Sequence, residues 1–249
     1  MEAARVAAIA GHEVTLYEKE TALGGQLLLA SEAPRKKKIK EFADFLTKQV
    51  QKLGVAIQTG KEVNSKVVSE LKPDAVILAT GVTPVMPAIK GITRENVVRG
   101  DEVIAGNASV GNRVAIIGGG EVGCELAELL AEKGKKVIVV EVLDELASKL
   151  PSRQRHFLSY QLACRGIQML TKTKCEEITD KGLQIINMWG EKESIELDTI
   201  VIATGSTPNN SLAEELKGKL KNLYTIGDCV EPRRIVNAIE EGTRVALEI

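Results

Sequence analysis

The stretch RVAIIGGGEVG, residues 113–123, decides the fold of this chain. After Arg113, residues 114–117 form a continuous apolar run, which predicts a strand covered on both faces, as in a parallel sheet. The glycines that follow have the spacing G-x-G-x-x-G, through Gly118, Gly120 and Gly123. In such a loop the first glycine permits a tight turn and the second lets the backbone approach a pyrophosphate. The third lets the following helix pack closely on the strand.

An acidic residue at a suitable distance strengthens this interpretation. Glu141 follows Gly120 by 21 residues and closes the next apolar run. A carboxylate there accepts hydrogen bonds from a ribose diol and repels a 2′-phosphate, which favours NAD over NADP. The helix after the loop adds N–H donors and a positive dipole. We therefore predict an NAD site formed by Gly118, Gly120, Glu121, Val122, Gly123, Glu141 and Gly205; a Rossmann-like unit that has lost its ligand is the alternative.

The same pattern occurs twice in the chain. A shift of 123 positions places residues 2–18 on residues 125–141, each copy reading as a helix, a glycine stop, an apolar strand and an acid. A second pair of similar segments, residues 74–81 and 198–205, ends in Ala-Thr-Gly. We infer that whole nucleotide-binding units are duplicated.

The first copy has no glycine loop. Under the shift Met1 falls on Cys124, one residue after Gly123, so the first copy has no counterpart to the eleven residues 113–123. We expect a chain that starts just inside a Rossmann unit, as an expression fragment or an internal methionine taken as a start would give. A unit that never had the loop is the alternative. Without a central strand in the first unit, the neighbouring strands would carry unpaired N–H and C=O groups. A strand-exchanged dimer or local disorder would relieve this.

Beyond the glycine loop, four features resemble the C-terminal FAD/NAD(P)-binding portion of the NADH:flavin oxidoreductase family. That family includes 2,4-dienoyl-CoA reductase, 2-enoate reductase and trimethylamine dehydrogenase. The features are residues 1–19, the turn LGGQL at 23–27, the two Ala-Thr-Gly segments, and TIGDC at 225–229. The resemblance covers essentially the whole chain. It implies a parent protein in which an N-terminal barrel with FMN and a four-iron cluster precedes this region and binds the substrate.

The resemblance also implies an FAD site in the first unit. In the family the aspartate of the last motif, here Asp228, contacts the ribitol of FAD. Glu18 closes a strand where a carboxylate can hold the adenosine ribose, as Glu141 does in the second unit. We expect FAD at Glu18, Lys19, Gly24, Gly25, Gln26, Leu27, Thr80, Gly81, Gly227 and Asp228. Plain turns at Gly81 and Gly205, and a helix N-cap at Asp228, are the alternatives.

Chain order predicts an α/β fold of two Rossmann-like domains with central parallel sheets, the NAD domain inserted into the FAD-type domain. Residues 1–106 form the first part of the FAD-type domain, residues 107–208 the NAD(H)-binding domain, and residues 209–249 the second part of the FAD-type domain. The connector 82–112 is rich in glycine and proline, as expected of a crossing between domains.

Composition disfavours several classes of protein. With 33 Lys and Arg against 34 Asp and Glu, the net charge of −1 disfavours a nucleic-acid partner, as does the 3% aromatic content. No apolar run reaches the roughly 18 residues of a membrane span, and no secretory signal opens the chain. The four cysteines contain no C-x-x-C pair, which disfavours a metal site or a redox pair within the chain. We expect a cytoplasmic protein without a metal or membrane partner.

These inferences predict the electron-entry module of a flavoprotein oxidoreductase. NADH would bind the second unit and pass hydride to an FAD in the first, and no side chain is needed as a catalytic acid or base. The fragment itself would lack the substrate chemistry of its parent. A non-catalytic scaffold that binds NAD or ADP and no longer holds FAD is the competing hypothesis. A stand-alone pyridine-nucleotide disulfide reductase is disfavoured by the lack of a C-x-x-C pair.

Overall fold

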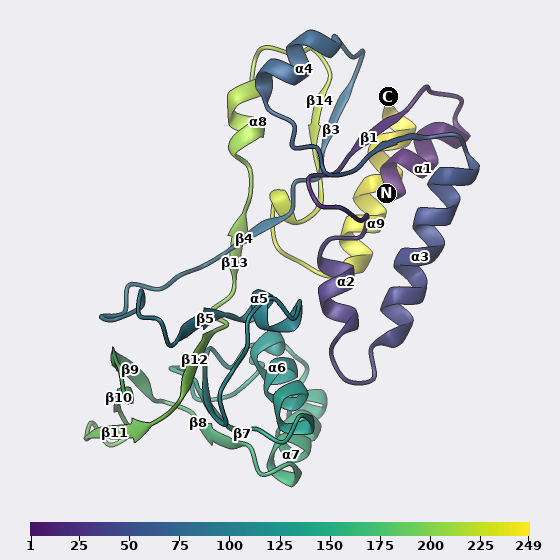
Figure 1. Cartoon of the computed structure of the whole chain (residues 1–249). Helices are drawn as coiled ribbons and strands as arrows, with labels where there is room; N and C mark the ends of the chain where they lie inside the picture. Colours follow the sequence, from purple (N-terminus) through teal and green to yellow (C-terminus); the bar gives the residue numbers. More distant parts are fainter. The chain divides into compact units, whose positions relative to one another are not determined.

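The chain folds into two units, and the computed structural model describes all of residues 1–249. The first unit contains Met1–Ser31, Lys36–Thr83 and Ser206–Ile249. The second contains Glu32–Arg35 and Pro84–Gly205. The chain thus leaves the first unit, builds the second, and returns to complete the first, as the colours in Figure 1 show.

The second unit is built on a five-stranded sheet in which every pairing is parallel. Its strand order is β5 (Val97–Arg99), β12 (Thr199–Ile202), β6 (Arg113–Ile117), β7 (Lys136–Val140) and β8 (Gln168–Leu170). The helices of this unit are α5 (Gly100–Ile104), α6 (Glu121–Glu132) and α7 (Ser152–Cys164). The sequence-based prediction of an α/β fold with a parallel sheet is confirmed.

The central strand β6 is buried on both faces, which explains its continuous apolar sequence. Val114 and Ile116 pack in a cluster with Leu126 and Leu130 of α6. Ala115 and Ile117, on the other face of β6, belong to a second cluster that includes residues of an antiparallel sheet. That sheet has the order β11 (Lys192–Glu196), β10 (Gly182–Ile186) and β9 (Lys174–Thr179).

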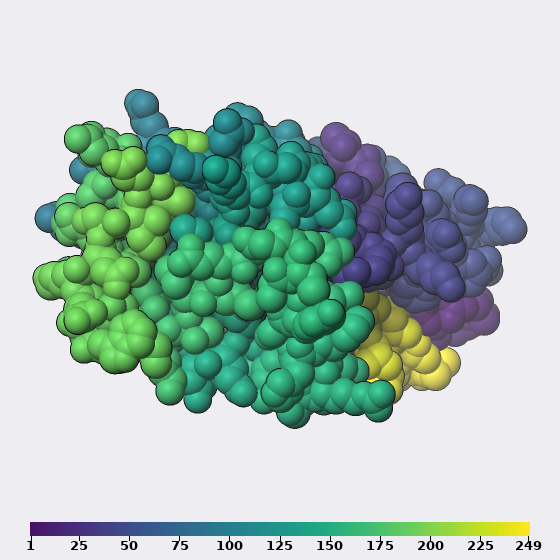
Figure 2. Space-filling model, turned by 90° about the horizontal axis from the view of Figure 1, so that it is seen from below, coloured from purple at the N-terminus to yellow at the C-terminus, as the bar shows by residue number.

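Helix α7 forms part of the surface of the second unit. Figure 2 shows its green stretch facing the viewer. The exposed fractions of Phe157 and Tyr160 are 62% and 68%, whereas Leu162 is fully buried against the sheet. No helix of the chain combines the length and the apolar character needed to cross a membrane.

The first unit contains two separate pairs of parallel strands. These are β1 (Thr15–Tyr17) with β2 (Ala56–Gln58), and β3 (Val76–Leu78) with β14 (Leu223–Thr225). Its helices are α1 (Glu2–Ile9), α2 (Gln26–Ser31), α3 (Lys37–Lys52), α4 (Ser65–Leu71), α8 (Ser211–Leu216), the 3₁₀ turn η1 (Gly227–Cys229) and α9 (Ile235–Glu248). Helix α1 packs on α9 through Val6, Ala7 and Val245.

The strand orders of the two units match the sequence repeat. In the second unit β6 separates the pair β5–β12 from the pair β7–β8. In the first unit the equivalent pairs are β14–β3 and β1–β2, and β1 and β3 each have one pairing partner. The two pairs of the first unit are therefore equivalent to the outer parts of the five-stranded sheet.

The two crossings of the chain pair with each other as β4 (Val82–Pro84) and β13 (Ser206–Pro208). The first crossing lies at Thr83–Pro84, earlier in the chain than the boundary near residue 106 that the sequence suggested. The difference arises because β5 pairs with β12 and so adds the connector to the second unit.

Candidate dinucleotide-binding sites

The glycine loop of the second unit lies at the carboxyl end of β6, and two of its glycines are required by packing. Gly118 has φ +108°, and a Cβ there would lie 2.4 Å from the carbonyl oxygen of Ala203. A Cβ on Gly123 would lie 1.9 Å from the carbonyl oxygen of Gly118. Neither position accommodates a side chain without moving the backbone. Glycine at 118 lets the loop pass beside Ala203, and glycine at 123 lets α6 approach the loop closely.

The other glycine of the motif, Gly120, faces open space. It caps α6, and a Cβ at this position would meet no atom within 4 Å. No side chain caps this helix end, and Glu121 and Val122 in its first turn are exposed. The free N–H groups at a helix N-terminus and the positive end of its dipole favour an anion. A dinucleotide pyrophosphate therefore fits here, with the backbone of Gly120 open to close approach.

Glu141 directly follows β7 and is only 9% exposed. One of its carboxylate oxygens accepts a hydrogen bond from the N–H of Gly119 at 2.6 Å. The other accepts the N–H of Leu143 at 2.8 Å. Each oxygen keeps a further lone pair that a ribose hydroxyl can use. The structure thus brings Glu141 against the glycine loop and adds a contact to that loop which the sequence did not indicate.

The Ala-Thr-Gly segment after β12 runs beside this loop. It also holds, by hydrogen bonds, the segment at Val85 through which the chain enters the second unit. The hydroxyl of Thr204 donates to the carbonyl oxygen of Val85 at 2.9 Å. The N–H of Val85 donates to the carbonyl oxygen of Gly205 at 2.9 Å. Gly205 has φ +94°, and a Cβ there would meet nothing within 4 Å, so one side of this turn stays open.

The first unit repeats this arrangement after β3. The hydroxyl of Thr80 donates to the carbonyl oxygen of Asn209, and the N–H of Asn209 donates to the carbonyl oxygen of Gly81 at 2.9 Å. Gly81 has φ +72° and is open in the same sense as Gly205. Both threonines of the repeat therefore hold a crossing segment, a role that sequence reasoning missed because it depends on chain segments more than a hundred residues apart.

Glu18 follows β1 and is half-buried. One of its carboxylate oxygens accepts the N–H of Glu20 at 3.0 Å. Its environment differs from that of Glu141, because no glycine loop lies beside it. Lys19 is exposed, and its ammonium lies 3.9 Å from the carboxylate of Glu20. The side chain of Glu18 has accepting capacity left for a ribose hydroxyl.

The LGGQL segment forms a turn that leads into α2. Gly24 has φ +128° and Gly25 has φ +48°, backbone conformations that favour glycine. A Cβ on Gly24 would lie 2.9 Å from Cγ of Leu28, whereas one on Gly25 would meet nothing within 4 Å. Gln26 begins α2, and the N–H of Leu27 donates to the carbonyl oxygen of Gly24 at 3.0 Å.

Asp228 lies in η1, directly after β14. Its Oδ1 accepts the N–H of Arg233 at 3.1 Å. The alternative of a helix N-cap at Asp228 is wrong, because the N-cap of α9 is Arg234. Gly227 has φ +69°, and its N–H donates to a carboxylate oxygen of Glu241 at 2.7 Å. In this unit Glu18, Gly81 and Gly227 thus all follow the carboxyl ends of parallel strands, where α/β sheets bind ligands.

The cysteine nearest the glycine loop is a packing residue. Cys124 is fully buried, and burial raises the pKa of its thiol to about 12. Its Sγ lies 3.5 Å from the carbonyl oxygen of Gly119. All four cysteines are free, and burial also raises the pKa of Cys175, to about 11.

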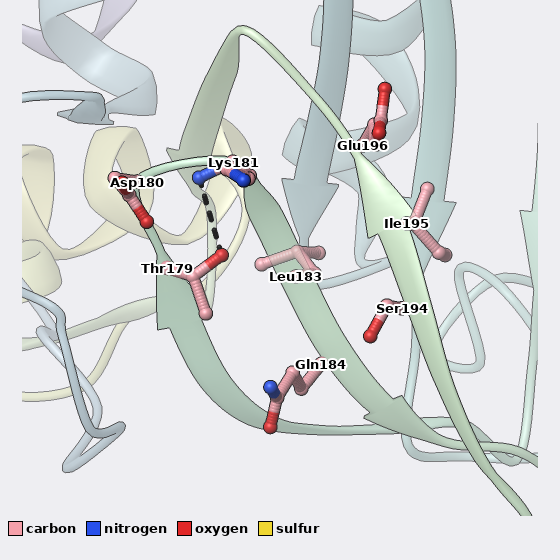
Figure 3. A pocket seen from close by; sticks show the side chains of 8 residues that line it. All are labelled: Thr179, Asp180, Lys181, Leu183, Gln184, Ser194, Ile195 and Glu196. Carbon is pink, nitrogen blue, oxygen red and sulfur yellow. Dashed lines mark hydrogen bonds between the residues drawn. The ribbon is translucent and has the colours of Figure 1, made fainter.

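A cavity of about 490 Å³ lies elsewhere in the second unit, along the β9–β10–β11 sheet (Figure 3). Figure 3 shows the side chains of β10 and β11 along it, and the N–H of Lys181 donating to the hydroxyl of Thr179 at 3.3 Å. The residues that line it are Thr179, Asp180, Lys181, Leu183, Gln184, Ser194, Ile195 and Glu196. None of them belongs to the glycine loop or follows a strand of the parallel sheet, so this cavity is separate from the nucleotide site.

A parallel sheet, a glycine loop at a helix N-terminus and strand-end acids together define a Rossmann-like dinucleotide-binding class of protein. The sequence matches the family described as pyridine nucleotide-disulphide oxidoreductase over residues 1–242, and the chain belongs to that family. FAD and NAD(H) are the cofactors that this membership implies, as the sequence predicted.

Similar proteins are longer than this chain. The NADH oxidase of Thermoanaerobacter brockii is 39% identical over 100% of this chain and 39% of its own length. The bilirubin reductase of Mediterraneibacter gnavus is 39% identical over 97% of this chain and 38% of its own length. The chain therefore spans about two fifths of the length of these curated relatives.

Solved structures share the fold. A complex of 2-naphthoyl-CoA reductase with 2-naphthoyl-CoA has a TM-score of 0.95 and 30% identity, over 100% of this chain and 38% of that one. Thioredoxin reductase of T. acidophilum has a TM-score of 0.76 and 22% identity, over 99% of this chain and 92% of that one. The second comparison concerns the fold alone.

Proposed function

We propose that this chain is the part of a flavoprotein oxidoreductase that takes hydride from NADH onto FAD. The observation that carries the proposal is the open N-terminus of α6, where Gly120 leaves room for a pyrophosphate beside exposed first-turn residues. When bound, FAD supplies the hydride-accepting chemistry, while the protein supplies binding and orientation. No side chain of the chain is assigned as a catalytic acid or base.

In the second unit each residue has a defined task toward NADH. The N–H groups at the start of α6, with Gly118, Gly120, Glu121, Val122 and Gly123, receive the pyrophosphate. Glu141 accepts a hydrogen bond from the adenosine ribose and disfavours the 2′-phosphate of NADPH. Gly205 leaves the neighbouring strand end open to the nucleotide.

In the first unit FAD takes the equivalent position. Glu18 and Lys19 lie where the adenosine ribose binds, and Gly24, Gly25, Gln26 and Leu27 form the turn that approaches the cofactor. Thr80 and Gly81 border the site. Gly227 and Asp228 contact the ribityl chain. The support is that these residues follow the carboxyl ends of parallel strands or the glycine turn next to them.

We further propose that the whole protein is longer, with an N-terminal barrel that carries FMN and an iron-sulfur cluster and receives the electrons. The lengths of the curated relatives support a longer protein. Its substrate would bind outside this chain. The cytoplasmic location stays a prediction.

A scaffold that binds NAD or ADP without FAD is the second candidate function. The feature that favours it is the pair of two-stranded sheets in the first unit, where β1 and β3 each have one pairing partner and no glycine loop accompanies them. We propose that a strand-exchanged dimer can supply the missing pairing. Sedimentation velocity tests this, because strand exchange requires a dimer. A chain that stays monomeric at all concentrations contradicts it.

Calorimetric titration of the purified chain with NADH and with FAD distinguishes the two functions. The oxidoreductase module binds one equivalent of each, with NADPH weaker than NADH. The scaffold binds NADH and shows no heat with FAD. A chain that binds neither nucleotide contradicts both functions.

A further inference from the structure

A closed ring of hydrogen bonds surrounds the turn that carries Asp228. The N–H of Gly227 donates to Oε2 of Glu241 at 2.7 Å. The guanidinium of Arg233 donates to Oε1 of the same carboxylate. The backbone N–H of Arg233 donates to Oδ1 of Asp228 at 3.1 Å. Gly227 is thus joined directly to Glu241 of α9, and Asp228 is joined to the same side chain through Arg233.

The backbone explains why the ring can close. Gly227 has φ +69°, a conformation suited to glycine, which directs its N–H toward α9. A Cβ on Gly227 would lie 3.6 Å from Cβ of Ala238, so α9 lies directly against the turn. Ala238 and Glu241 are three residues apart and share one face of the helix, which brings the carboxylate over the turn.

The charges of the ring are complementary. Side-chain exposure is 21% for Glu241 and 32% for Arg233, so both are partly shielded from water. The Gly227 N–H, and next the Arg233 guanidinium, hold the pKa of Glu241 below its usual range. Arg233 also lies 3.5 Å from the carboxylate of Glu231, and Arg244 of α9 adds a favourable charge. Glu241 is therefore ionised at neutral pH and can accept both hydrogen bonds.

The ring leaves one oxygen of Asp228 available. Asp228 is half-buried, its Oδ1 accepts the Arg233 N–H, and its Oδ2 makes no hydrogen bond within the chain. A carboxylate whose one oxygen is held by the backbone has a fixed orientation, and its other oxygen can accept a ligand hydroxyl.

We propose that Glu241, acting with Arg233, is a positioning residue that orients Asp228 so that its Oδ2 accepts a hydroxyl of the FAD ribityl chain. The inference rests on the proposed function, because it assigns FAD to the first unit. It adds two residues, Glu241 and Arg233, whose effect on FAD passes through Asp228.

A double-mutant cycle on FAD binding tests this. The FAD affinity is measured by calorimetry for wild type, Asp228→Ala, Glu241→Ala and the double variant, with circular dichroism to verify folding. Glu241→Ala should raise the Kd for FAD about tenfold, and the double variant should bind no more weakly than Asp228→Ala. Glu240→Ala is the matched control, since Glu240 is the exposed neighbour on the same helix, and its Kd should equal that of wild type.

Arginine variants keep the test decisive if Glu241→Ala does not fold. Arg233→Met removes the bond to Glu241 but keeps the backbone N–H that holds Asp228, and should raise the Kd for FAD about threefold. Arg5→Met is its control, because it removes a similar partly exposed pair in the same unit, to Glu2 of α1 at 2.7 Å, and Arg5 has no contact with the ring. Its Kd should stay at the wild-type value.

The outcomes separate this inference from the proposed function. Additive losses in the cycle, or equal losses in the two arginine variants, overturn the positioning role while FAD binding by the wild type stands. A wild-type chain that binds NADH and no FAD overturns the flavin part of the proposed function and this inference with it.

Discussion

Replacement of Gly120 by alanine separates nucleotide binding from folding. Gly120 has φ −66° and ψ −179°, a conformation open to alanine, and the added Cβ meets no atom within 4 Å. A glycine-to-alanine change at a compatible position stabilises a protein by about 0.4–1 kcal/mol, because it restricts the unfolded chain. Alanine is a poorer helix N-cap than glycine, which offsets this gain at the N-cap of α6, so we expect the free energy of unfolding of Gly120→Ala, measured in urea, to stay within about 1 kcal/mol of wild type.

Nucleotide affinity should nevertheless fall. The new methyl group occupies the open side of the loop, where the pyrophosphate must approach the backbone. Loss of one hydrogen bond to a charged group costs about 1.5–3 kcal/mol. The Kd for NADH, measured by calorimetry, should therefore rise at least about tenfold.

A second glycine variant provides the contrast. A Cβ on Gly123 lies 1.9 Å from the carbonyl oxygen of Gly118, so α6 must move away from the loop. Gly123→Ala should weaken NADH binding and also destabilise the fold by about 1–3 kcal/mol. If Gly120→Ala binds NADH with the wild-type Kd, the loop is not the pyrophosphate site and the reasoning is refuted.

Three further predictions follow from individual contacts in the second unit. Thr204→Val removes the hydrogen bond to the Val85 carbonyl and should lower the free energy of unfolding in urea by about 1 kcal/mol. An unchanged free energy would show that this hydrogen bond does not stabilise the fold. Asp198 accepts the backbone N–H of Arg113, and this hydrogen bond lowers the pKa of Asp198. The ionised carboxylate therefore stabilises the fold at neutral pH, and this stabilisation is lost as the pH falls through the lowered pKa. The Tm difference between wild type and Asp198→Asn should therefore shrink in acid, and a constant difference counts against it. Cys164 is the one exposed cysteine, so a thiol reagent should modify one thiol in the folded protein and four after denaturation; fast reaction of a second thiol contradicts the burial of the rest.

Features set by local sequence were predictable. The turn and helix start at residues 113–123 depend on neighbouring glycines and on a continuous apolar strand, so the sequence was sufficient to predict both. The strand pairs of the two units follow the 123-residue repeat, because equivalent segments fold alike. The α/β class and the two cofactors followed from these features and from the resemblance.

Features set by tertiary contacts were not predictable. Strand β5 has three residues, and only its pairing with β12 assigns it to the second unit. The carboxylate of Glu141 was expected to face a ribose, but its bond to Gly119 depends on how closely the loop approaches β7. The ring around Asp228 closes through Glu241, an ordinary surface glutamate by sequence.

Anaerobic absorbance spectroscopy tests the central claim most directly. The purified chain is mixed with FAD, freed of excess cofactor, and titrated with NADH while the flavin band at about 450 nm is followed. We expect a protein-bound flavin band that bleaches with one equivalent of NADH. A bound flavin that keeps its absorbance in excess NADH, or a colourless chain that still binds NADH, would contradict it.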